Sequence, residues 1–126
     1  VVEPSAYFPA VIGRPQRAQI GFSGWTSDYA GPSGFIVPLF SCDGSSNATS
    51  FCDRDIDRRI EEAGLLQTSD PAGARDRWSE IEHALVDQAP WIPLGNAYWA
   101  NLASQRLGNY QSTPSAGPLI DQMWVR

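Results

Sequence analysis

The clearest structural signal in this chain is an amphipathic helix that begins at a proline. In Ser69-Asp70-Pro71, the aspartate can cap free N–H groups, and the proline occupies a first turn where no N–H is needed. Apolar residues then recur at helical spacing on one face: Ala74, Trp78, Ile81, Leu85 and Ala89. We therefore expect a surface helix over Pro71–Ala89, packed on a sheet and stopped by Pro90.

A second helix is predicted over Arg54–Leu66. Asp53 stands at the capping position, and the inner face of the helix carries Ile56, Ile60 and Ala63. Gly64 is expected to end or loosen this helix.

The aspartates of this segment also suggest calcium. Asp53, Asp55 and Asp57 alternate as they do in an EF-hand loop. That loop needs glycine at its sixth position and glutamate at its twelfth, where this chain has Arg58 and Gly64. A capped helix is therefore the better interpretation, and the sequence predicts no metal site.

Two further segments are typical of extended structure. Arg17–Trp25 alternates loosely and is the first expected strand, whereas Trp91–Tyr110 is aromatic-rich and begins with prolines that favour a sheet edge. Together with the helices, these segments predict an α/β fold with two main helices on a mixed sheet. The 126 residues suit a single domain, or part of a larger one, with no internal boundary.

The two cysteines flank a polar loop. Cys42 and Cys52 enclose DGSSNATSF, and a disulfide between them would stabilise the fold by about 2–3 kcal/mol in the chain-entropy model. This pairing favours an oxidising compartment outside the cytoplasm, and two free thiols in a cytosolic protein are the alternative. Within the loop, Asn47-Ala48-Thr49 fits the glycosylation acceptor pattern, a short motif that is common by chance.

Charge and composition exclude several partners. The net charge is −5, and the basic residues are scattered arginines, so nucleic acid and anionic membrane are poor partners. No apolar run approaches the ~20 residues of a membrane span, and a signal peptide is not recognisable, so any targeting signal is expected outside this sequence. His83 lies off the apolar helix face with no nucleophile motif nearby, so we expect a solvated side chain and no catalytic residues.

The stretch Gly21–Phe40, GFSGWTSDYAGPSGFIVPLF, is the candidate functional segment. A strand that ends at Gly24 and Trp25 would deliver the carboxylate of Asp28 to a sheet edge, where it can hold a cation. The alternative is structural: Asp28 starts a turn and Trp25 fills the core.

Several segments, in order, resemble the C-terminal part of the family 5 extracellular solute-binding proteins, the peptide-, dipeptide- and nickel-binding receptors of ABC importers. The resemblance covers about residues 18–126. It rests on GWTSDYAGPSGFIVPLF, FCDRDIDRRIEEA, DPAGARDRWSEIEHALVDQAPWIPL, RLGNY and DQMWVR, and the cysteine pair is similar to that of actinobacterial members.

This resemblance implies a fold and a function. The chain would be a fragment of the C-terminal lobe of a longer protein with a two-lobe periplasmic-binding-protein type II fold, without cofactors. Its ligand would be an oligopeptide or similar small solute, and its partners would be ABC permease subunits. In peptide-binding relatives the matching segment lines the cleft, which assigns ligand binding to Gly24, Trp25, Thr26 and Asp28. The location would be extracytoplasmic, with a lipid anchor outside this sequence as the only membrane contact.

Two other classes of function stay open at this point. A glycosidase would pair Asp28 with a second carboxylate across a sugar, although no second acid has a comparable aromatic setting. A structural or interaction module would use its tryptophans only in the core and at interfaces.

Overall fold

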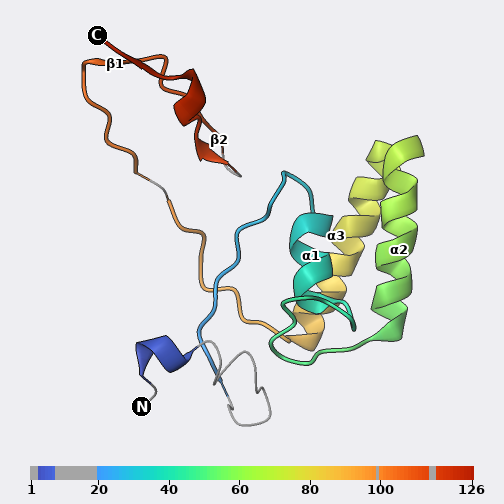
Figure 1. The fold of residues 1–126 in the computed structure, drawn as a ribbon. Coiled ribbons are helices and arrows are strands. Elements are labelled where there is room, and N and C mark those ends of the chain that lie inside the picture. The colour runs from blue at the N-terminus through green and yellow to red at the C-terminus, as the bar shows by residue number, and fades with distance from the viewer. Residues whose placement is uncertain (1–2, 8–19, 99, 114–115) are drawn as a thin grey trace.

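The computed structural model describes residues 3–7, 20–98, 100–113 and 116–126. Figure 1 shows the helical region joined by a long extended segment to a small region of strands. The elements, in chain order, are η1 (Pro4–Ala6), α1 (Ser33–Phe40), α2 (Arg54–Ser69), α3 (Pro71–Gln88), β1 (Leu107–Gly108), β2 (Ser112–Thr113), β3 (Gly117–Pro118), η4 (Ile120–Gln122) and β4 (Trp124–Val125).

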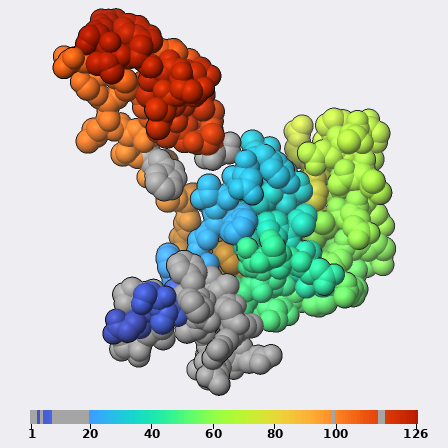
Figure 2. Space-filling model, in the orientation of Figure 1, coloured from blue at the N-terminus to red at the C-terminus, as the bar shows by residue number. Residues whose placement is uncertain are grey.

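The three α-helices bury one shared apolar core. Helices α2 and α3 turn back on each other at Asp70, and α1 lies against them (Figure 1). Figure 2 shows this region as one closely packed body. Its buried apolar residues are Ile36, Leu39, Phe40, Ile56, Ile60, Ala63, Ala74, Trp78, Ile81 and Leu85. The two predicted apolar faces are thus confirmed, except that Ala89 is exposed.

Capping side chains fix both long helices. The Asp53 carboxylate accepts hydrogen bonds from the backbone N–H groups of Asp55 and Ile56 at 2.9 and 3.3 Å, so this segment is a capped helix, as expected, and not a calcium loop. The Asp70 carboxylate accepts from the Gly73 N–H at 3.0 Å. Helix α3 ends at Gln88 and is capped by Ala89, whose φ of 49° is left-handed.

The prediction that Gly64 ends the second helix was wrong. Helix α2 continues through Gly64 to Ser69. A glycine in a helix costs about 1 kcal/mol relative to alanine, which the burial of Ile60 and Ala63 in the same helix can outweigh.

The α/β class and its two main helices are confirmed, but the helices pack on each other and not on the expected sheet. Among the described residues, the strands pair only as two short antiparallel ladders, β1 with β4 and β2 with β3. Residues 20–25 form no strand, and residues 17–19 lie outside the described part. The Tyr7 hydroxyl instead bonds the N–H and the C=O of Phe22. A strand forms only by pairing with a neighbouring strand, and none of the described strands pairs with residues 20–25.

The C-terminal residues dock on β1. Leu107 pairs with Val125 and Gly108 pairs with Trp124. A Cβ on Gly108 would lie 2.4 Å from the Trp124 ring, so glycine is required for this contact. None of the described helices has both the length and the hydropathy needed to cross a membrane.

Candidate functional site

Asp28 lies on an exposed bend immediately before α1. Its side chain is exposed, and no described residue forms an ion pair or hydrogen bond with its carboxylate. Gly24 and Thr26 are exposed as well, and the space around the Gly24 Cα is open. The carboxylate is therefore accessible to a cation from outside this segment.

Trp25 attaches this bend to the helical core. Its ring is half-buried and packs against the core, and its Nε1–H donates to the Gly34 carbonyl in α1 at 3.0 Å. Trp25 therefore packs against the core, as the structural alternative expects, whereas Asp28 lies outside the core. Of the predicted ligand-binding residues, Trp25 is anchored and the other three are exposed on the same short segment.

Two hydrogen bonds shape the bend on either side of Asp28. The Ser27 hydroxyl donates to the Tyr29 carbonyl at 2.5 Å, and the Tyr29 and Ser33 hydroxyls are 2.9 Å apart. These contacts were missed by the sequence analysis. The spacing of Tyr29 and Ser33 by four residues, at a helix start, was the available signal.

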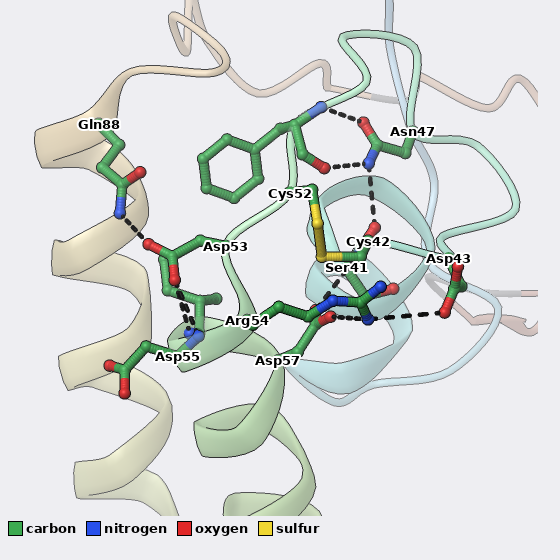
Figure 3. Close-up of a disulfide and its surroundings, with 12 residues drawn as sticks. Ser41, Cys42, Asp43, Asn47, Cys52, Asp53, Arg54, Asp55, Asp57 and Gln88 are labelled. Atoms are coloured by element: carbon green, nitrogen blue, oxygen red, sulfur yellow. Dashed lines mark hydrogen bonds and ion pairs between the residues drawn. A yellow bond between two sulfur atoms is a disulfide. The ribbon is translucent and has the colours of Figure 1, made fainter.

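The disulfide joins the end of α1 to the start of α2. Cys42 and Cys52 are bonded, as predicted, with their Cα atoms 4.3 Å apart. Figure 3 shows this bond beside Asp57, whose carboxylate accepts from the Cys42 N–H at 3.1 Å. The disulfide therefore holds α1, the helix on which the Asp28 bend is anchored, against α2.

A shallow hollow of about 390 Å³ lies between α1, the disulfide loop and α2. Its charged lining includes Asp43, Arg54 and Asp57, and the Arg54 guanidinium is 3.3 Å from the Asp57 carboxylate and 3.9 Å from that of Asp43. The hollow contains none of the predicted ligand-binding residues, and the carboxylates of Asp43 and Asp57 already pair with Arg54. It is therefore a weaker candidate than the Asp28 bend.

No group of three or more potential ligands among the described His, Cys, Asp and Glu residues is arranged to hold a metal ion. His83 is exposed on α3, as expected.

Curated relatives of this chain are proteins of solute binding and transport. The di/tripeptide-binding protein 4 of Pseudomonas aeruginosa is 29% identical over 94 residues, which cover 72% of this chain and 17% of the relative. The heme-binding protein A of Haemophilus influenzae is 31% identical over 97 residues, covering 75% and 17%. The peptide transport periplasmic protein SapA of the same organism is 25% identical over 95 residues, covering 73% and 16%.

No family model and no solved structure matches the chain. The relatives nevertheless agree on one class, the solute-binding proteins of transport systems. They confirm the resemblance of this chain to the C-terminal part of the family 5 extracellular solute-binding proteins. The chain spans less than one fifth of the length of these relatives, at 17% and 18% for the first two.

Proposed function

We propose that this chain is a single domain in the C-terminal lobe of a longer solute-binding protein, which captures an oligopeptide or similar small solute for an ABC importer. The observation that carries the proposal is the Asp28 bend, an exposed carboxylate on a segment that Trp25 anchors to the core. The names of several relatives, which include di/tripeptide-binding and dipeptide-binding proteins, support a peptide as the solute.

The Asp28 carboxylate would receive the ammonium group of the solute. A charge-assisted hydrogen bond of this kind contributes about 1.5–3 kcal/mol, or about 10- to 150-fold in affinity. The backbone beside Gly24 and Thr26 would pair with an extended ligand, because the absence of a side chain at Gly24 leaves room for close approach. Trp25 would contribute one wall of the cleft, and the other lobe would contribute the opposite wall.

The proposed location is outside the cytoplasm. The disulfide supports this location, because such bonds persist in oxidising compartments, and one relative is named as a periplasmic protein. Permease subunits of the importer are the proposed protein partners, and a lipid anchor outside this sequence is the proposed membrane contact. We propose no catalytic role, and the names of the relatives, which are those of binding and transport proteins, support this choice.

Native mass spectrometry of the full-length protein, purified from its host, tests the proposed function. We expect a co-purified peptide or small amine, and a rise in melting temperature when a synthetic tripeptide with a free α-amino group is added. The absence of both a carried solute and a thermal shift with any tested peptide would contradict the proposal. Hydrolysis of chromogenic glycosides by the same preparation would favour the glycosidase alternative.

A further inference from the structure

The residues on both sides of Asp28 rest on the backbone of Gly34. This glycine is buried in the first turn of α1, and its carbonyl accepts the Trp25 Nε1–H. A Cβ at position 34 would lie 2.4 Å from the Ser27 hydroxyl oxygen and 3.1 and 3.2 Å from two carbons of the Tyr29 ring. The segment 25–29 therefore contacts α1 at a point where any side chain would occupy the same space.

Position 34 requires glycine because there is no room for a side chain, and not because its backbone φ and ψ angles favour glycine. Gly34 lies within a helix, and the only described glycine with a positive φ is Gly117. Alanine would therefore fit the helical backbone, and it is a better helix former than glycine. Its methyl group would displace the Ser27 hydroxyl, which donates to the Tyr29 carbonyl, and would push on the Tyr29 ring.

We infer that Gly34 is a positioning residue for Asp28. Because Gly34 has no side chain, Ser27 and Tyr29 can pack close to α1, which fixes the bend between them. The position of the Asp28 carboxylate relative to α1 then depends on this contact. This inference rests on the proposed function of Asp28 as the site of the ligand's ammonium group. It adds a residue that contacts no ligand itself and acts only through the placement of that carboxylate.

Substitution of Gly34 by alanine in the full-length protein tests the inference. Gly64→Ala is the matched control, because Gly64 is an exposed helix glycine with open space around its Cα. Calorimetry with a synthetic tripeptide, in its free-amine and N-acetylated forms, separates binding through Asp28 from the rest of the affinity. Amide NMR signals of residues 27–29 in the ligand-free proteins report the position of the bend directly.

We expect Gly34→Ala to shift the NMR signals of residues 27–29 and to weaken binding of the free-amine tripeptide by about 3- to 30-fold, part of the about 10- to 150-fold carried by a full charge-assisted bond. Affinity for the N-acetylated form should match that of Gly64→Ala. The combination with Asp28→Asn should lose no more affinity than Asp28→Asn alone.

Two results would overturn the inference. One is an unchanged set of signals for residues 27–29 in Gly34→Ala. The other is full affinity for the free-amine tripeptide in Gly34→Ala while Asp28→Asn weakens it, which leaves the proposed function intact. If Asp28→Asn itself binds like the parent, the proposed function fails, and the positioning role fails with it.

Discussion

Asn47 organises the disulfide loop through its side-chain amide. Its Nδ2 group donates to the Ser41 and Phe51 carbonyls at 3.0 and 2.6 Å, and its Oδ1 accepts from the Phe51 N–H at 3.2 Å (Figure 3). The sequence marked this asparagine only as a possible glycosylation acceptor. In the fold, the unmodified amide links the two ends of the loop, Ser41 and Phe51, next to the Cys42–Cys52 bond.

Replacing Asn47 by aspartate should destabilise the loop. The substitution keeps the size and one acceptor, but it removes both donors and places a carboxylate against two carbonyl groups. We expect the free energy of unfolding to fall by about 1–3 kcal/mol, measured by urea denaturation. Ser45→Asp, which adds the same charge at an exposed position of the loop, is the control. Equal stability of the two variants would show that the amide contributes nothing specific.

Titration of Asp53 should make the stability of the fold depend on pH. A hydrogen bond from the Gln88 side chain, at 2.7 Å, is the main cause that lowers the pKa of the Asp53 carboxyl below its ordinary value of 3.8. The N–H groups of Ile56 and Asp55 lower this pKa further. Because the folded-state pKa is the lower one, the stabilisation is complete above pH 3.8 and is lost as the pH falls through the folded-state pKa.

Asp53→Asn should flatten the acid limb of the stability curve. Asparagine can still cap the helix but does not titrate, so its melting temperature should fall less than that of the parent between about pH 5 and about pH 2. Gln88→Leu should also flatten the limb, because it removes the main cause of the shift. Thermal melts followed by circular dichroism give the comparison. Parallel curves for parent and Asp53→Asn would rule out this role.

At the scale of elements, the helices were predictable because their signals are local. Asp53 and Asp70 cap α2 and α3 within a few residues, and the spacing of apolar residues marks the buried face. The sheet was not predictable in this way. Alternation in residues 20–25 indicates an extended backbone but does not identify a partner strand, and β1 pairs with β4 across a long sequence separation.

The candidate site was predictable in part. The exposure of Asp28 and the packing of Trp25 follow from residue type, but the contact of Ser27 and Tyr29 with Gly34 depends on how the bend folds over α1. Such close approaches leave no periodic signal in a sequence.

The Cys42–Cys52 bond should stabilise the packing of α1 on α2. It closes a sequence separation of 10 residues, for which the chain-entropy model gives about 2–3 kcal/mol. The double variant Cys42→Ser/Cys52→Ser should lose about this much free energy of unfolding in urea. The reduced parent serves as the control and should behave like the variant. Identical denaturation midpoints for oxidised and reduced parent would contradict this contribution.

At the scale of the whole molecule, the described chain has exposed apolar residues in addition to the proposed ligand-binding segment. Large apolar side chains of residues 92–98 and 100–102, such as Leu94 at 79% and Leu102 at 103% exposure, lie open to solvent. Apolar surface of this kind is usually covered by other parts of a protein. In the proposed longer two-lobe protein, other parts of the protein would therefore cover these residues.

The most direct measurement is a thermodynamic cycle on the full-length protein, combining Asp28→Asn with N-acetylation of a tripeptide ligand. Calorimetry should show that Asp28→Asn weakens binding of the free-amine peptide by about 10- to 150-fold, with little effect on the acetylated peptide. The ligand-free melting temperature should stay close to that of the parent. Equal affinities of parent and variant for the free-amine peptide would contradict the assignment of Asp28 as the ammonium site, as would a large loss of melting temperature.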